Sequence, residues 1–324
     1  MTTSPQRAAV VYNPIKVDVE ALRRVVTRTE RDMHWQETLW FETSIEDPGV
    51  GQTREAIAQG ASVIMAAGGD GTVRSVAEGV HGTDARLALL PSGTGNLLAR
   101  NLDLTLDNLE HSVDTAFLGK DRPIDLGILE AERPDGSREK FVFLVMAGVG
   151  LDAQMIANTR PDLKKRVGWL AYVDAIVRSL RSNNRLRMRF SVDGQPPRNM
   201  SAHTVLVGNC GSLPGNILLL PEAAVDDGIF DVVALRPKGF VGWLQIWVKI
   251  VWENGVLRRT QVGRKLLSYT KEVRTLRYLK GSSFVARLSR PEEFELDGDD
   301  FGTAIALKAT VQPGGITVRV PADS

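Results

Sequence analysis

The feature that most constrains this chain is a glycine-rich loop directly after an apolar run. Five apolar residues, 63–67, lead into Gly68-Gly69-Asp70-Gly71-Thr72. Because glycine lacks a Cβ atom, such a loop can bring backbone N–H groups close to an anion. The acid in the loop would repel a bare phosphate unless a cation compensates its charge, and Mg²⁺ on a nucleotide is the simplest candidate. The loop therefore predicts a nucleotide-phosphate site.

A second loop further along the chain has a similar setting. Residues 87–90 read as a strand, and after them come Pro91-Ser92-Gly93-Thr94-Gly95-Asn96 and a helical pattern. Backbone N–H groups at the helix N-terminus and the Thr94 hydroxyl would form a second anion site. Alone, this segment reads equally well as an N-cap turn. Two such loops after neighbouring strands favour phosphate binding.

The first third of the chain alternates short apolar strands with helical patterns, which predicts a parallel sheet with crossover helices. The predicted strands are residues 8–12, 37–42, 63–67 and 87–90, and the predicted helices are 17–31, 53–59, 73–79 and one that begins at 95. Ligands of such sheets bind beyond the carboxyl ends of the strands. Asn13-Pro14 and both glycine-rich loops fall at those ends.

Beyond this part the pattern becomes strand-rich. The predicted strands are residues 189–193, 203–207, 229–235, 283–288 and 316–320, and two longer helical patterns cover 163–182 and 240–257. This change predicts a second domain that is built mainly of β-strands.

Composition excludes several classes of protein. The 324 residues carry a net charge of +1, so no global charge attracts nucleic acid. The single cysteine, Cys210, excludes an internal disulfide and a multi-cysteine zinc site, and it suits a reducing compartment. The short polar N-terminus does not resemble a signal peptide, and no apolar stretch reaches the ~20 residues that span a bilayer. We expect a soluble or peripheral protein.

Five motifs in order resemble those of the diacylglycerol kinase catalytic domain superfamily, which includes bacterial soluble lipid kinases and sphingosine kinases. They are Val11-Tyr12-Asn13-Pro14, the loop at Gly68, the loop from Leu90 to Asn96, the stretch from Val207-Gly208-Asn209 to Asp231, and Leu296-Asp297-Gly298-Asp299. A lone Gly-Gly-Asp-Gly would also suit NAD kinases and phosphofructokinases, which share that loop. The resemblance extends over nearly the whole chain.

The resemblance implies a fold of the class α/β + β. An N-terminal α/β ATP-binding domain would comprise residues 1–124 and a returning segment of about 308–324, and a β-rich, sandwich-like lipid-substrate domain would comprise 125–307. The active site would lie in the cleft between the domains. The activity implied is ATP- and Mg²⁺-dependent phosphoryl transfer to a lipid alcohol, most simply diacylglycerol to phosphatidate.

The family motifs also assign residues to roles. Asp299 matches the general base, with Asp70 as a further catalytic residue that could organise Mg²⁺ or the lipid hydroxyl, and Asp125 matches an acid near the lipid headgroup. A structural Mg²⁺ would bind the Asp227 carboxylate and the main-chain oxygens of Ala224 and Ile229. The residues expected to contact ATP are Asn13, Pro14, Thr43, Gly68, Gly69, Asp70, Gly71, Thr72, Gly93, Thr94 and Asn96.

Two departures from the family pattern leave alternatives open. The bacterial lipid kinases usually carry glutamate where this chain has Asp299, so the base is one methylene shorter. Many bacterial diacylglycerol kinases place aspartate directly after Asn96, whereas Leu97-Leu98 here resembles sphingosine kinases. A long-chain base or another lipid alcohol is therefore the alternative acceptor. A non-catalytic nucleotide- or lipid-sensing protein is the alternative from another class.

A lipid kinase needs a surface that meets the membrane. Between Arg160 and Arg189 the chain carries nine basic and two acidic residues, which could bind anionic headgroups; solvated arginines beside a buried helix face are the plainer reading. We expect a peripheral protein at the cytoplasmic face of the membrane that binds its lipid substrate there and no nucleic acid. A homodimer is left open.

Overall fold

The computed structural model describes residues 6–93, 95–150, 185–213, 217–218, 220, 222–236 and 276–322. The long helical patterns predicted at 163–182 and 240–257 lie outside these residues, as does Thr94. The chain divides into two compact units. Unit 1 comprises Met1–Leu126, Val225–Gly228 and Gln312–Ser324, and unit 2 comprises Gly127–Ala224 and Ile229–Val311.

Unit 1 contains a parallel sheet with strand order β16-β4-β3-β1-β2. Its strands are β1 (Ala8–Tyr12), β2 (Leu39–Glu42), β3 (Val63–Gly68), β4 (Arg86–Pro91) and the end of β16 (Asp299–Val320). Its helices are α1 (Val19–Asp32), α2 (Val50–Ala58), α3 (Asp70–Val80), α4 (Leu97–Asn101) and α5 (Leu109–Leu118). The predicted parallel sheet with crossover helices is confirmed.

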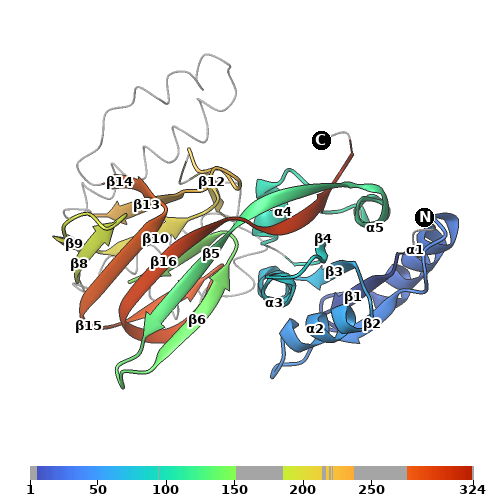
Figure 1. Ribbon diagram of the computed structural model, residues 1–324, viewed down its shortest axis with the longest axis horizontal. Helices are drawn as coiled ribbons and strands as arrows, with labels where there is room; N and C mark the ends of the chain where they lie inside the picture. Colours follow the sequence, from blue (N-terminus) through green and yellow to red (C-terminus); the bar gives the residue numbers. More distant parts are fainter. Residues whose placement is uncertain are drawn as a thin grey trace, which may run out of the picture. The chain divides into compact units, whose positions relative to one another are not determined.

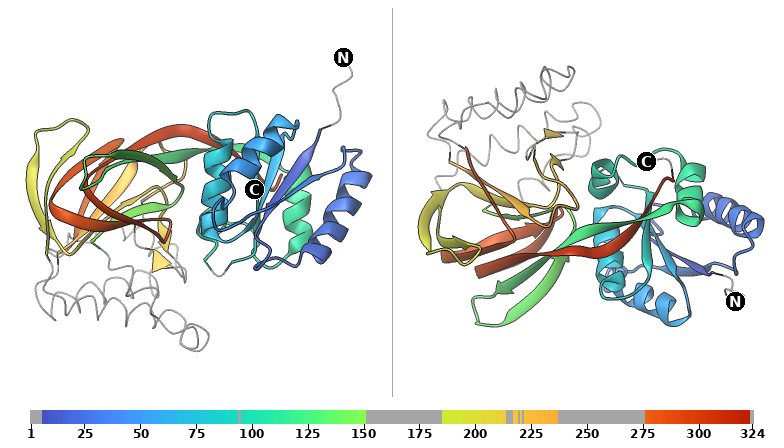
Figure 2. Two further views of the ribbon diagram at one scale, coloured as in Figure 1. Left: turned by 90° about the horizontal axis from the view of Figure 1, so that it is seen from below. Right: turned by 45° about the horizontal axis from the view of Figure 1, so that its top comes forward.

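Helices cover both faces of this sheet (Figure 2). Every residue of β3 is buried, as parallel strands between two helical layers require. On one face Val10 and Met65 pack with α1 and α5, and α2 and α3 pack together on the other. Helix α1 begins where the Asp18 carboxylate accepts the Ala21 N–H, a regular N-cap. This packing fixes where each strand ends, and therefore where the loops beyond it lie.

Unit 2 is built of antiparallel strands. They are β6 (Arg138–Phe143), β7 (Met146–Val149), β8 (Leu186–Val192), β9 (Arg198–Ala202), β10 (Thr204–Gly208), β11 (Ser212–Leu213), β12 (Ile217–Leu218), β13 (Phe230–Leu235), β14 (Leu276–Gly281) and β15 (Ser283–Leu296). Two long paired strands, β5 (Lys120–Glu132) and β16, give residues to both units (Figure 1). The predicted β-rich second domain is confirmed.

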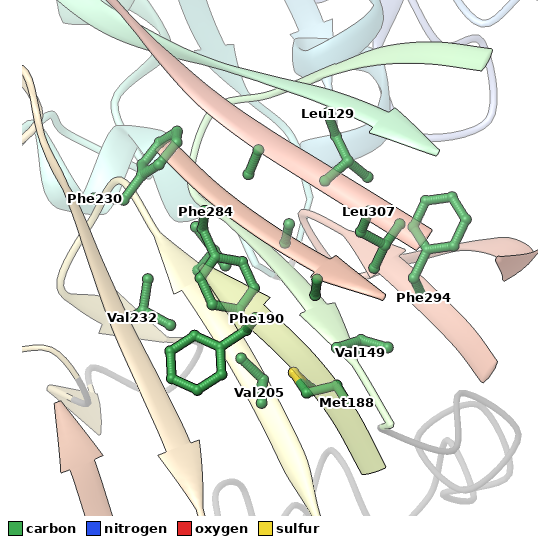
Figure 3. Close-up of a cluster of buried hydrophobic side chains, with 14 of the residues drawn as sticks. Leu129, Val149, Met188, Phe190, Val205, Phe230, Val232, Phe284, Phe294 and Leu307 are labelled. Atoms are coloured by element: carbon green, nitrogen blue, oxygen red, sulfur yellow. The ribbon is translucent and has the colours of Figure 1, made fainter. Parts of the chain in front are cut away.

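The core of unit 2 comes from alternate residues of these strands (Figure 3). On β8, Leu186, Met188 and Phe190 are buried, whereas Arg187 and Arg189 are exposed. Phe190 stacks on Phe284 of β15, with ring centroids 6.0 Å apart. A sheet with one buried and one solvated face produces this alternation.

Several elements extend beyond what the pattern predicted. Strand β15 runs to Leu296 and β16 begins at Asp299, although only 283–288 and 316–320 were expected. Polar residues alternate along both strands because one face of each is exposed, and these residues hide the strand signal. The strand signal of β5 is hidden by its charged first residues and by Pro123, because proline is uncommon within strands.

Candidate active site

Four loops meet at the carboxyl edge of the parallel sheet in unit 1. Asn13 follows β1 and donates its backbone N–H to the Ala67 carbonyl at 2.9 Å, and Thr43 follows β2 and donates to the Tyr12 carbonyl at 2.9 Å. The glycine-rich loops follow β3 and β4, which pair in parallel up to Gly68 and Pro91. The structure thus brings the predicted ATP-binding residues that it describes, all of them except Thr94, to one edge, where ligands of such sheets bind.

The two glycine-rich loops touch each other through their backbones. Ser92 donates its N–H to the Gly68 carbonyl at 3.1 Å. A Cβ on Gly93 would lie 2.9 Å from the Gly69 Cα, and a Cβ on Gly68 would lie 2.6 Å from the Thr72 hydroxyl oxygen. Any other residue at Gly93 would push one backbone away from the other. Close approach between the loops therefore requires glycine there.

Asp70 ties the second loop to the first. It is the first residue of α3, and its carboxylate accepts the backbone N–H groups of Asn96 at 3.0 Å and Leu97 at 2.5 Å. These donors belong to the N-cap residue and the first residue of α4, whose N–H groups have no partner within the helix. The arrangement gives Asp70 a positioning role. Its predicted contact with Mg²⁺ or the lipid hydroxyl stays a prediction.

Asn96 shapes the second loop from within. It is buried, its φ is 48°, and its side chain accepts the Gly93 N–H at 3.1 Å and donates to the Gly93 carbonyl at 2.8 Å. Asparagine adopts the left-handed region more readily than most residues. Asn96 therefore closes the loop around position 94, which lies outside the described part of the chain.

Lys16 is a residue that the sequence analysis missed. It follows the Asn13-Pro14 loop, and a Cβ built on Gly69 would lie 2.8 Å from its ammonium nitrogen. An exposed lysine over a phosphate-type loop supplies the positive charge that an anion at this edge needs. Its spacing from Asn13 was the only signal, and one lysine at such a spacing occurs in many chains by chance.

Asp125, the predicted substrate residue, is 2% exposed. Its carboxylate accepts the N–H groups of Gly228 at 2.6 Å and Gly314 at 2.9 Å. Its own N–H donates to the Val225 carbonyl at 2.7 Å. Asp125 thus holds the turn that precedes β13, and its contact with a lipid headgroup stays a prediction.

The same turn carries the predicted structural metal ligands. Asp227 is exposed, its neighbour Gly228 has a φ of 74°, and Asp226 forms an ion pair with Arg122 at 2.8 Å. One carboxylate and two main-chain oxygens, from Ala224 and Ile229, are the hard donors that Mg²⁺ prefers, so the donor set fits that ion. Within the described residues, no three histidine, cysteine or acidic side chains gather into a metal site.

In unit 2 the predicted Leu296-Asp297-Gly298-Asp299 motif forms the hairpin turn between β15 and β16. Leu296 pairs with Asp299, and the two central residues have positive φ, 51° for Asp297 and 91° for Gly298. Asp-Gly with both φ values positive is typical of a type I′ turn. The turn ends at Asp299, the predicted base, whose side chain is exposed.

Asp297 anchors this hairpin in the core. It is 5% exposed, and its carboxylate accepts the N–H groups of Leu144 at 2.9 Å, Val145 at 2.8 Å and Met146 at 3.0 Å. On the other side of this segment, Asn209 donates its side chain to the Leu144 carbonyl at 3.1 Å and its N–H to the Val145 carbonyl at 2.8 Å. Two motifs distant in sequence therefore meet at residues 144–146.

Cys210 belongs to the same buried network. Its thiol lies 3.5 Å from the Leu144 carbonyl, and burial, together with the nearby charge of Asp297, raises the pKa of the thiol. A thiol that does not ionise is a poor nucleophile. Cys210 therefore fills space in this network.

Comparison with known proteins agrees with this geometry. The family model described as "Diacylglycerol kinase catalytic domain" matches residues 7–129, and "YegS C-terminal NAD kinase beta sandwich-like domain" matches residues 144–253. A Pseudomonas aeruginosa protein named "Probable lipid kinase YegS-like" is 33% identical over 275 residues, which are 83% of this chain and 80% of that protein. The chain belongs to the diacylglycerol kinase catalytic domain family.

Two further matches agree with this result, one in sequence and one in fold alone. The protein named "Diacylglycerol kinase" from Bacillus subtilis is 26% identical over 82% of this chain and 84% of its own length. A diacylglycerol kinase crystal structure from Bacillus anthracis has the same fold, with a TM-score of 0.66 at 17% identity over 98% of both chains. The predictions of this family and of a lipid-kinase type of enzyme are confirmed. Among the described residues, no helix is long and apolar enough to cross a membrane.

Proposed function

We propose that this member of the family transfers the γ-phosphate of ATP to the primary hydroxyl of diacylglycerol and forms phosphatidate. The observation that carries the proposal is the pair of glycine-rich loops at the ends of β3 and β4, joined by the Asp70 carboxylate at Asn96 and Leu97. Two loops with backbone N–H groups at one sheet edge suit a chain of phosphates better than a single anion.

The proposed nucleotide site uses residues of unit 1. Asn13, Thr43 and the two loops line the edge where ATP would bind, and the Lys16 ammonium group lies next to Gly69. Positioning and charge neutralisation supply most of the catalysis in phosphoryl transfer, because the transition state is loose and highly charged. Mg²⁺ bound with ATP would neutralise phosphate charge, and Asp227 with the oxygens of Ala224 and Ile229 would hold a structural ion.

The proposed base lies in unit 2. The Asp299 carboxylate would accept the proton of the lipid hydroxyl while the hydroxyl oxygen forms a bond to the γ-phosphorus. The bond between that phosphorus and the bridging oxygen then breaks, and ADP leaves. Asp299 suits this role because its side chain is exposed, whereas Asp297 is buried and holds three N–H groups.

The acceptor can be identified by radiolabelled phosphate transfer from ATP into mixed micelles. The panel contains diacylglycerol, monoacylglycerol, sphingosine and ceramide, each with Mg²⁺ present or chelated. We expect Mg²⁺-dependent labelling of diacylglycerol that is lost in Asp299→Ala. Labelling of sphingosine alone would favour the second acceptor, which Leu97 and Leu98 after Asn96 suggest. ATP binding without labelling of any lipid would contradict the proposal.

The same proposal places the protein at a membrane. Its acceptor is embedded in a bilayer, so we infer that the chain works as a peripheral protein at the cytoplasmic face and contributes to phospholipid biosynthesis. Equilibrium sedimentation with and without vesicles would test this association. Whether the chain forms a homodimer is left open, and the sedimentation runs without vesicles would measure its oligomeric state.

A further inference from the structure

The outward face of β9, β8 and β15 in unit 2 is unusually basic. Arg187 and Arg189 of β8 and Arg287 of β15 are exposed on it, beside Asn199 and Ser201 of β9. Together with the buried Met188, Met200 and Leu288 beneath them, these side chains line an open hollow of about 520 Å³. No acidic side chain is among its lining residues. We call the exposed surface formed by these three arginines, Asn199 and Ser201 the arginine face.

The strand register sets two of these arginines against each other. Arg287 is the direct cross-strand partner of Arg189 in the antiparallel pair of β15 and β8. Side chains in such positions have Cβ atoms about 4.5–5.5 Å apart, and like charges there are destabilising. Among the described residues neither Arg187 nor Arg189 has an acidic partner within ion-pair distance, and Arg287 reaches only Glu132 at 3.6 Å.

The part of the same sheet that adjoins the arginine face shows the usual arrangement. On β5 and β6, Arg138 is the cross-strand partner of Glu132 and pairs with it at 3.1 Å, and Lys308 of β16 pairs with Glu130 at 3.4 Å. Cross-strand charges are thus matched between β5 and β6 and opposed between Arg189 and Arg287. A repulsive pair beside an open hollow is relieved when an anion enters it.

We propose that the arginine face binds the phosphate headgroups of an anionic bilayer. The choice of a bilayer rests on the proposed function, since the acceptor is a membrane lipid, and the net charge of +1 gives no general attraction to other polyanions. Arg187 and Arg189 belong to the basic segment noted in the sequence, and the rest of that segment before Arg185 lies outside the described residues. Arg287 joins them through strand pairing, which the sequence did not predict.

Vesicle sedimentation tests this proposal independently of activity. The test protein is the full chain carrying Arg187→Gln, Arg189→Gln and Arg287→Gln, and the probes are phosphatidylcholine vesicles with or without about one third phosphatidylglycerol. Because each basic residue near an anionic surface contributes about 1 kcal/mol, the loss of three predicts a fall in affinity of roughly 100-fold. The matched control removes the same charge from exposed arginines of unit 1, Arg24→Gln, Arg28→Gln and Arg54→Gln.

The proposal expects the control to bind anionic vesicles within about threefold of the wild type, with binding that weakens in high salt. Equal losses in both triple variants, or wild-type binding by the arginine-face variant, would overturn it. The proposal would also be overturned if the arginine-face variant lost binding to a DNA duplex but kept binding to anionic vesicles. Phosphate transfer to a short-chain, water-soluble diacylglycerol should be unchanged in the arginine-face variant. Vesicle binding without phosphate transfer by the wild type would refute the proposed function alone.

Discussion

Asp70 in unit 1 and Asp297 in unit 2 hold main-chain N–H groups of another segment in the same way, but their surroundings differ. Asp70 is half-buried at the start of a helix and takes two N–H groups from the next loop. Asp297 is 5% exposed in a hairpin turn and takes three N–H groups from a distant strand connection. An acid in a family motif can therefore have the structural role of holding a neighbouring segment. The degree of burial indicates which acid remains accessible for chemistry.

The sharpest test of this comparison is to replace Asp299, the exposed acid close to the buried Asp297. General acid–base groups contribute about 10²- to 10⁴-fold to rate, so Asp299→Ala should lower kcat by that amount. Asp299→Glu restores a carboxylate with the length usual in the family, and it should keep activity within tenfold of the wild type. The measurement is steady-state phosphate transfer to diacylglycerol. Unchanged kcat in Asp299→Ala would move the base to another residue, with Asp70 next to test.

Replacing the buried acid should affect folding more than rate. Asp297→Ala leaves three buried N–H groups without an acceptor, and each such loss costs about 1–3 kcal/mol, partly relieved by water. We expect the free energy of unfolding, measured by urea denaturation, to fall by at least about 3 kcal/mol. Asp297→Asn keeps one acceptor oxygen and should lose less. Wild-type stability in Asp297→Ala would show that these hydrogen bonds are not important.

Separating the two glycine-rich loops should weaken nucleotide binding. A Cβ in Gly93→Ala would lie 2.9 Å from the Gly69 Cα, and overpacking of this kind typically costs about 1–3 kcal/mol. Fluorescent ATP analogues should bind about tenfold more weakly, a loss within that range. Gly136→Ala provides a glycine control, because a Cβ there meets no atom within 4 Å. The φ of 86° at Gly136 disfavours alanine, so this control should lose some stability but keep the wild-type Kd for ATP.

Asp70→Asn distinguishes positioning from catalysis. The amide keeps one acceptor oxygen but points an NH₂ group at a backbone N–H, so the second loop should loosen and the Kd for ATP should rise severalfold. If positioning is its whole role, kcat at saturating ATP should stay within about threefold of the wild type. A much larger fall in kcat with unchanged Kd would instead support the predicted contact with Mg²⁺ or the lipid hydroxyl.

The smallest predicted effect is the pH dependence of stability that His203 in unit 2 contributes. Burial, with help from the charge of Arg185, lowers the pKa of His203 below its usual value of 6.5. Below pH 6.5 the unfolded chain therefore binds more protons than the folded one, and stability falls as the pH drops towards the folded pKa. Denaturation between pH 7 and 5 should show this slope, and His203→Gln should reduce it. An unchanged slope in His203→Gln would show that other groups cause the pH dependence of stability.

The sequence predicted the loops at the carboxyl edge of the sheet in unit 1 because their signals are local. Gly68, Asp70 and Gly93 lie in loops next to strongly apolar strands, and parallel pairing brings such loops together. The hydrogen bonds that Asp70 accepts from Asn96 and Leu97 could not be predicted, because they depend on how closely the loops pack. Lys16 was missed for the same reason.

Unit 2 was predicted less completely because its contacts are distant in sequence. The motifs at Asn209 and Asp297 were recognised, but their meeting at Leu144 depends on the antiparallel order of strands, which no local pattern encodes. The opposition of Arg189 and Arg287 likewise follows from strand register alone. Long-range register is what the structure adds to the sequence.

The most direct test of the whole account is to measure ATP binding and phosphate transfer on one variant, Asp299→Asn. The base is proposed to lie in unit 2 and the nucleotide loops in unit 1, so this substitution should leave the Kd for ATP within twofold of the wild type. Single-turnover transfer to diacylglycerol in the same sample should fall at least about 100-fold. Transfer at the wild-type rate, with ATP bound as before, would contradict the proposed division of roles between the two units.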